Sequence, residues 1–133
     1  MIRGRVVNGV QPGNDQSSAE AQSQAEQLWA SRQRDTWYMA IVDRMDGLVL
    51  LCSDPKPLEA GADDIRGYHF QNAVAGYSGA GPITTVKILT LFGFGRFKDL
   101  FRKVARGDQE AFYGFVKVDG EVVFTKSPQD LLP

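Results

Sequence analysis

The residues best suited to chemistry form a glycine-rich turn that runs directly into an apolar segment. The turn reads Gly76-Tyr77-Ser78-Gly79-Ala80-Gly81-Pro82. A glycine-rich connection into a helix directs free backbone amides and the positive end of the helix dipole toward one point, which suits a phosphate or a carboxylate. We therefore expect an anionic, nucleotide-like small molecule at this place. The expected ligand-binding residues are Gly76, Tyr77, Ser78, Gly79, Gly81, Thr84, Thr85, Lys87 and Arg96.

The side chains of this turn suggest individual roles, although its spacing fits no established phosphate-binding motif. Tyr77 would stack on a base, and Ser78, Thr84 and Thr85 would donate hydroxyl protons. The glycines match neither the dinucleotide-binding pattern G-x-G-x-x-G nor the P-loop, which ends in Gly-Lys-Ser/Thr. An architectural alternative therefore stands beside the binding site. In that alternative the glycines only permit positive φ angles and close packing of a helix on a sheet.

Residues for a catalytic or metal centre are sparse. His69 and Cys52 are the only histidine and cysteine of the chain, so a tetrahedral Cys/His zinc site is not expected. A weaker alternative is a hydrolase that uses His69 as base and Ser78 as nucleophile, but no Gly-x-Ser-x-Gly elbow surrounds Ser78. The acidic residues between positions 59 and 64 fit a solvated loop better than a cation site. We therefore expect a binding protein that is not an enzyme and holds no cofactor or metal.

Basic residues concentrate in one segment of a chain whose net charge is −1. Between positions 87 and 106 the acidic Asp99 is outnumbered by Lys87, Arg96, Lys98, Arg102, Lys103 and Arg106. Phe97 and Phe101 fall on the apolar stripe of this segment, so we expect them in the core rather than stacked on bases. With a sequence pI of about 5.8, the chain makes a poor nucleic-acid binder. A solvated basic face that helps to hold the anion is the better interpretation.

Length and cysteine content indicate one domain in a reducing compartment. A chain of 133 residues suits a single core. No apolar run approaches the roughly 18 residues of a membrane-spanning helix, and the start at Met1 does not lead into a signal-peptide pattern. Cys52 lies in an apolar run, where a buried and inert thiol is expected. We therefore expect a cytoplasmic protein that does not bind membranes.

Residues 1–35 are predicted to form a polar N-terminal arm that is partly helical or flexible. Ser17 to Glu20 has the spacing of a capping box for a helix that would reach Arg34. Leu28 and Trp29 are the only large apolar side chains between positions 11 and 35. The helix would pack through these two residues alone, serve as an oligomerisation arm, or remain flexible.

Residues 36–133 are predicted to form one α+β domain that contains two β-hairpins. Each hairpin is indicated by an Asp-Gly dipeptide between two β-prone runs, because this dipeptide tolerates the positive φ angles of a tight turn. The hairpins are expected at about 37–52 and 115–124. A third strand is expected from Tyr68 to Ala75, where the glycine-rich turn begins.

Two helices are expected between the hairpins. Pro82 would be the first residue of a helix buried on several sides, and a second helix would cover about 96–106. Asp108 would cap a short helical turn through Tyr113, whereas a competing interpretation continues the helix through Val116 and removes the second hairpin. The expected fold is a small, mainly antiparallel sheet with two or three helices on one face.

The glycine-rich turn also carries a partial resemblance to a known family. The run Gly76 to Pro82, followed by an apolar helix, another helix and the segment Phe112-Tyr113-Gly114-Phe115, resembles an uncharacterised family of small bacterial and phage proteins with a Gly-Tyr-Gly-Gly-Ser-Gly-Pro motif. The resemblance covers about residues 68–124, and this chain has Ser78 and Ala80 where the motif has glycine and serine. It implies a cytoplasmic accessory protein, and a phage origin would make sequestration of a host nucleotide signal a natural role.

Two functions are therefore consistent with the sequence. The first is a non-enzymatic module that binds an anionic, nucleotide-like small molecule at the glycine-rich helix N-terminus. The alternative is a protein-interaction or inhibitor module that acts by homo-oligomerisation and partner binding, through the apolar helix and the polar arm.

Overall fold

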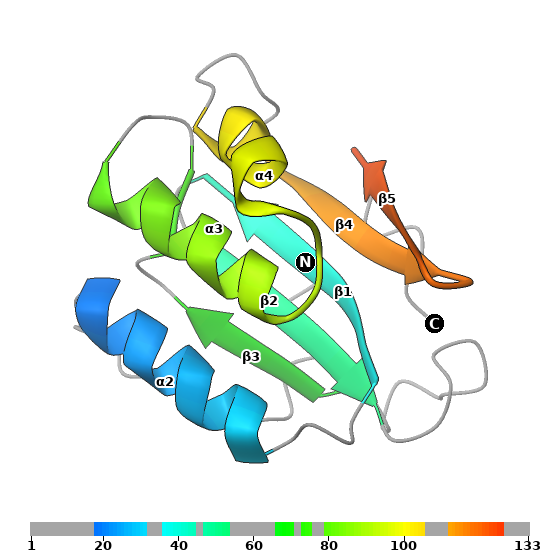
Figure 1. Cartoon of the computed structure of the whole chain (residues 1–133), viewed down its shortest axis with the longest axis horizontal. Helices are drawn as coiled ribbons and strands as arrows, with labels where there is room; N and C mark the ends of the chain where they lie inside the picture. Colours follow the sequence, from blue (N-terminus) through cyan, green and yellow to red (C-terminus); the bar gives the residue numbers. More distant parts are fainter. Residues whose placement is uncertain are drawn as a thin grey trace.

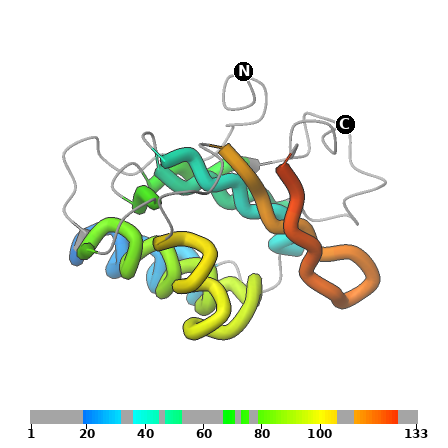
Figure 2. Tube along the Cα trace, turned by 90° about the horizontal axis from the view of Figure 1, so that it is seen from above, coloured from blue at the N-terminus to red at the C-terminus, as the bar shows by residue number. Residues whose placement is uncertain are grey.

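In the residues that it describes, the computed structural model is a five-stranded antiparallel sheet with three helices packed on one of its faces (Figures 1 and 2). This arrangement confirms the predicted α+β class. The structure describes residues 18–31, 36–44, 47–53, 66–70, 73–75, 79–105 and 112–126. The elements are α2 (Ser18–Ser31), β1 (Thr36–Asp43), β2 (Gly47–Ser53), β3 (Arg66–Phe70), α3 (Ala80–Leu91), α4 (Phe97–Val104), β4 (Phe112–Val118) and β5 (Glu121–Thr125).

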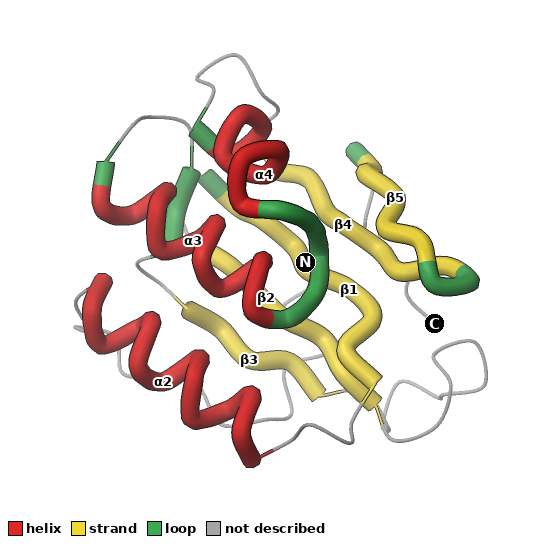
Figure 3. The backbone as a smooth tube through the Cα atoms, viewed as in Figure 1, coloured by secondary structure: helices red, strands yellow, loops and turns green. Residues whose placement is uncertain are grey.

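The sheet joins the two predicted hairpins side by side in the order β3-β2-β1-β4-β5 (Figure 3). Ala40 of β1 lies opposite Leu50 of β2 on one side and opposite Phe115 of β4 on the other. All neighbouring strands are antiparallel. The two edge strands of the described sheet are therefore β3 and β5.

The turn of the second hairpin follows directly from its Asp-Gly dipeptide. Asp119 has a φ of 50° and Gly120 a φ of 83°, the pair of positive φ angles that a two-residue type I′ turn requires. This turn matches the right-handed twist of the flanking strands and fixes the register, in which Val118 lies opposite Glu121. The prediction of a hairpin at this position is confirmed.

Three predicted boundaries are wrong. The third strand ends at Phe70, and residues 73–75 are irregular. The helix expected to begin at Pro82 begins at Ala80, with Gly79 as its N-cap. Strand β4 begins at Phe112, so Tyr113 belongs to a strand instead of a helical turn, and the competing continuous helix is also excluded. Pairing with β1 along this stretch explains the result, because the partner strand satisfies the backbone groups that a local helical turn would otherwise bond.

Helix α3 lies between α2 and α4 and against the sheet (Figure 1). Its side chains are buried over most of its circumference, as its apolar composition predicts. The largest fully buried side chains of the core are Tyr113, Phe70, Phe92, Phe94, Met39, Leu48, Leu50, Leu51, Ile88 and Leu89.

Helix α2 belongs to the same core. Ala21 and Ala25 have no exposed surface, and the rings of Trp29 and Phe92 meet edge to face with their centroids 5.4 Å apart. Trp37 of β1 contacts the same Phe92 ring at 4.5 Å. Of the alternatives for this helix, α2 therefore packs against the core, with Leu28 and Trp29 among its contacts. The division into an arm over residues 1–35 and a separate domain stays a prediction. The rest of the predicted arm lies outside the described residues.

Lys117 of β4 connects the turn between α3 and α4 to the sheet through two side-chain interactions. Its Nζ donates a hydrogen bond of 2.6 Å to the carbonyl oxygen of Phe92 and lies 4.6 Å from the centroid of the Phe94 ring. Burial lowers the pKa of Lys117. Gly93, which follows Phe92 at the end of α3, has a φ of 83°, and this backbone conformation favours glycine.

Candidate functional site

The predicted anion site would begin at the N-terminus of α3. Gly79 is extended (φ 176°, ψ −171°), no side chain of the described residues caps the helix, and its first turn has no acidic residue. Neither Gly79 nor Gly81 is among the described glycines with left-handed φ. Backbone strain therefore does not require glycine at these two positions. Gly76, Tyr77 and Ser78, which would complete the site, lie outside the described residues.

The two threonines of the predicted site are buried inside the fold. Thr85 has no exposed surface, and its hydroxyl lies within hydrogen-bonding distance of the carbonyl oxygens of Val74 (2.7 Å) and Gly81 (3.1 Å). Because a hydroxyl has one proton to donate, these contacts engage it within the protein. Thr85 thus anchors α3 to the chain that precedes the glycine-rich turn. Thr84 is also buried.

The two predicted cations lie apart from each other. Lys87 is exposed in the middle of α3, on the side that faces α2. Arg96 follows the other end of α3 and forms an ion pair with Asp99, with Nη2 3.2 Å from Oδ2. Since α3 has 12 residues and an α-helix rises about 1.5 Å per residue, Arg96 is separated from Gly79 by a helix roughly 18 Å long. The described structure does not bring Arg96 to the helix N-terminus.

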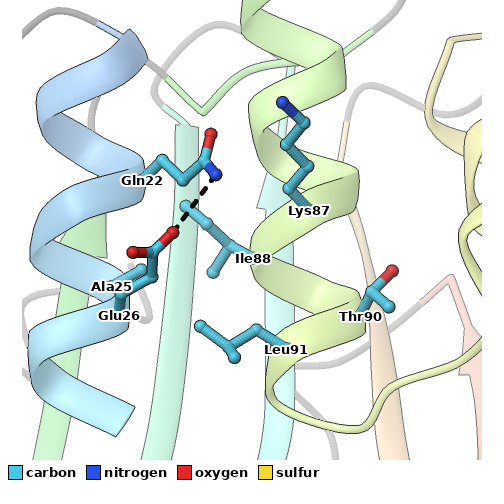
Figure 4. A pocket seen from close by; sticks show the side chains of 7 residues that line it. All are labelled: Gln22, Ala25, Glu26, Lys87, Ile88, Thr90 and Leu91. Atoms are coloured by element: carbon cyan, nitrogen blue, oxygen red, sulfur yellow. Dashed lines mark hydrogen bonds between the residues drawn. The ribbon is translucent and has the colours of Figure 1, made fainter. Parts of the chain in front are cut away.

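A shallow groove separates α2 from α3 (Figure 4). Its volume of about 220 Å³ lies below the roughly 300 to 1,000 Å³ that are usual for small-molecule sites. Gln22 donates a hydrogen bond of 3.2 Å to Glu26 at one rim, and the Lys87 side chain runs along α3 instead of toward that carboxylate. The groove is lined by Gln22, Ala25, Glu26, Lys87, Ile88, Thr90 and Leu91.

Helix α4 presents a more apolar surface than predicted. Phe97 was expected in the core but is 42% exposed, and its ring stacks on Phe101 with centroids 6.1 Å apart. Leu100 and Val104, further along the same stripe, are buried. The stripe therefore reaches the core only after the first residues of this short helix.

The hairpin surface, which we define as Val118, Val122 and Val123, is the main exposed apolar feature that the sequence analysis missed. These side chains are 50%, 37% and 46% exposed, respectively. Two of them lie on β5, the edge strand after β4. The run Glu121 to Phe124 carries apolar residues at neighbouring positions, which places them on both faces of the strand. This signal was visible in the sequence, but only the strand order shows that the run lies at an edge.

Two buried tyrosines have hydroxyl groups for which no hydrogen-bond partner is found, as far as the described part of the chain goes. Tyr38 lies on the sheet face opposite the helices, and Tyr113 lies in the core beneath them. Burial raises the pKa of Tyr38 to about 12, with a further contribution from Cys52. Burial also raises the pKa of Tyr113, against a smaller lowering by Arg44. Neither hydroxyl ionises at neutral pH.

Among the residues that the structure describes, no group of three or more His, Cys, Asp or Glu side chains could hold a metal ion. Cys52 is buried as predicted. None of the helices in the described ranges is long and apolar enough to cross a membrane. No protein-family model, curated protein or solved structure matches this chain. The resemblance to the bacterial and phage family stays a prediction.

Proposed function

We propose that this chain is a non-enzymatic protein-interaction module that binds another protein chain through the β4–β5 hairpin. The observation that carries this proposal is the hairpin surface, where three valines remain exposed beside a core that buries most other large apolar side chains. Exposed apolar residues that cluster at one element are typical of binding surfaces, whereas single exposed ones need no explanation. Phe97 of α4 adds a fourth exposed apolar side chain on the described surface.

The edge position of β5 supplies the mode of binding. An extended segment of another chain can add to an exposed sheet edge, where backbone hydrogen bonds give affinity and alternate side chains give specificity. Strand β5 has one strand neighbour in the described sheet, β4, and its pairing with β4 runs without a register shift. Edge strands that must stay unpaired usually carry lysine, proline or a bulge. The run Glu121-Val122-Val123-Phe124-Thr125 contains neither lysine nor proline.

Site-specific photo-crosslinking in the cells that naturally produce the chain tests this proposal. A photoreactive amino acid is placed at position 123 in one variant and at position 30 in a control, because Ala30 is an exposed residue of α2 on another part of the surface. We expect irradiation to link position 123 to a protein chain and to leave position 30 without comparable adducts. Equal or absent adducts at both positions would contradict the proposal.

A second candidate function is anion binding at the N-terminus of α3. It is favoured by the uncapped first turn without acidic residues and by the exposed Lys87 on the same helix. Its ligand would be an anionic, nucleotide-like small molecule held by backbone amides at the start of α3 together with Lys87, without Thr84, Thr85 or Arg96. Sequestration of a nucleotide signal in the cytoplasm would be its role. Calorimetry against mono-, di- and cyclic nucleotides tests it, and the absence of heat across the panel would exclude it.

Three variants extend that measurement. Lys87→Ala is expected to weaken nucleotide binding several-fold, whereas Lys98→Ala, which removes another exposed cation on α4, should leave it unchanged. Gly79→Ala should keep the melting temperature of the parent, since an extended backbone accepts alanine. If the methyl group blocks the amides, the same variant loses the ligand.

A further inference from the structure

The register of the second hairpin determines which backbone groups of β5 point away from β4. In a hairpin closed by a two-residue turn, the residues on either side of the turn form a hydrogen-bonded pair, and such pairs then alternate with non-bonded ones. Val118 and Glu121 are that first pair, and Val116 and Val123 are the next bonded pair. Val122 and Phe124 therefore direct their N–H and C=O groups toward the outer edge. No strand of the described sheet pairs with that edge.

We propose that β5 pairs antiparallel with β5 of a second copy of this chain, around a two-fold axis through Val123, so that two five-stranded sheets become continuous. This inference rests on the proposed function and names the partner as the chain itself. In this register Val122 of each copy lies opposite Phe124 of the other. The outward groups of both residues then form four backbone hydrogen bonds, and each copy supplies the same patch, as a two-fold interface requires.

The side chains complement this register. Val123 lies opposite Val123 of the second copy as a non-hydrogen-bonded pair, in which side chains approach most closely. Val123 shares the sheet face of Val116, opposite the helices, whereas Val122 and Phe124 share the face of Phe115. Pairing would therefore cover Val122 and Val123 on both faces at once, and these two are the exposed large apolar side chains of β5.

The charges at the ends of β5 favour an antiparallel second copy. Asp119 and Glu121 lie at the start of the strand, and Lys126 follows its end. Antiparallel pairing brings the acidic start of one strand beside the basic end of the other, whereas parallel pairing would bring like charges together. The opposite edge strand, β3, is less suited to self-pairing, because its sequence Arg66-Gly67-Tyr68-His69-Phe70 is more polar and α2 lies beside it (Figure 1).

The mass of the purified full chain in solution is the first test. Light scattering after size exclusion should give twice the 14.7 kDa of one chain at micromolar concentration. Val123→Lys places two like charges at the axis and should raise the dissociation constant at least 100-fold. Ala30→Lys is the control, because Ala30 is an exposed residue of α2 that lies outside the hairpin surface. It should remain dimeric. A monomeric parent, or a dimer that survives Val123→Lys, would overturn the inference.

Disulfide trapping is the second test and does not depend on the folding of the lysine variant. Opposed residues of a non-hydrogen-bonded pair have Cα atoms about 4.5 Å apart, which a disulfide can span. Val123→Cys should therefore form a covalent dimer on mild oxidation, whereas Ala30→Cys on α2 should not, and the native Cys52 is buried. Equal trapping of both variants would contradict the register. A monomeric parent whose position 123 crosslinks to a different protein would refute self-pairing and leave the proposed function standing.

Discussion

At the scale of single residues, the hydroxyl groups of Tyr38 and Tyr113 are the clearest cost in the fold. Both are buried without a hydrogen-bond partner among the described residues, and a buried polar group left unpaired costs about 1 to 3 kcal/mol. Tyr113→Phe keeps the ring contacts with Phe115 and Phe124 and removes only the hydroxyl. We expect it to raise the free energy of unfolding by about 1 kcal/mol, measured by urea denaturation at pH 7. A loss of stability would show that the hydroxyl has a partner.

The raised pKa values of the same two hydroxyls determine how the free energy of unfolding is expected to change at alkaline pH. The phenol of Tyr38 ionises at pH 10.0 in a model peptide and at about pH 12 in the folded chain, and the pKa of Tyr113 is raised as well. The folded state therefore keeps protons that the unfolded state has lost, so the free energy of unfolding should fall as the pH rises from 10 toward 12. The double variant Tyr38→Phe, Tyr113→Phe should show a weaker fall. An identical slope in parent and variant would contradict this assignment.

Only some of the positions that the structure gives to the predicted anion-site residues could be predicted from the sequence. The position of Arg96 was predictable, because a helix that begins near Pro82 and ends before Gly93 places residue 96 at its far end. The role of Thr85 was not, since its hydroxyl lies near the carbonyl of Val74, 11 positions earlier in the chain. Spacing along one helix cannot show a contact made to a different segment.

At the scale of elements, features fixed by local chemistry were predicted well and those fixed by partners were not. Both predicted hairpins form. Asp119 and Gly120 make the two-residue turn of the second, whereas Gly47 of the first pairs with Asp43 at the start of β2 and has a positive φ of 96°. The early start of β4 depends on pairing with β1, and the edge position of β5 depends on the strand order. Phe97 fits the apolar stripe of α4 but remains exposed, because the periodicity of a short helix does not show where the core beneath it ends.

The docking of α2 can be tested with two alanines of that helix. Ala21 has no exposed surface and Ala30 is exposed. Ala21→Leu forces three additional carbon atoms into a packed interface and should lower the free energy of unfolding by about 1 to 3 kcal/mol. Ala30→Leu makes the same chemical change in solvent and should stay within about 0.5 kcal/mol of the parent. Equal stabilities in urea denaturation would mean that α2 does not pack as the structure describes.

At the scale of the whole molecule, the question is whether the chain unfolds as one unit or as a helical arm and a separate domain. Trp29 of α2 and Trp37 of β1 both contact Phe92, at ring-centroid distances of 5.4 and 4.5 Å. These are the only two tryptophans of the chain. A shared core predicts one cooperative transition, as is usual for domains below about 150 residues.

Trp29→Phe and Trp37→Phe each leave a single fluorescent reporter, one on either side of Phe92. In Trp29→Phe, we expect the urea transition measured by Trp37 fluorescence to coincide with the transition measured by far-ultraviolet circular dichroism. In Trp37→Phe, we expect the same agreement between Trp29 fluorescence and dichroism. The dichroism transition of the same variant is the reference, so a change in stability caused by the substitution itself does not affect the comparison. A Trp29 transition at clearly lower urea than the dichroism transition would mean that α2 detaches first. That result would restore the separate N-terminal arm that the polar composition of residues 1–35 predicts.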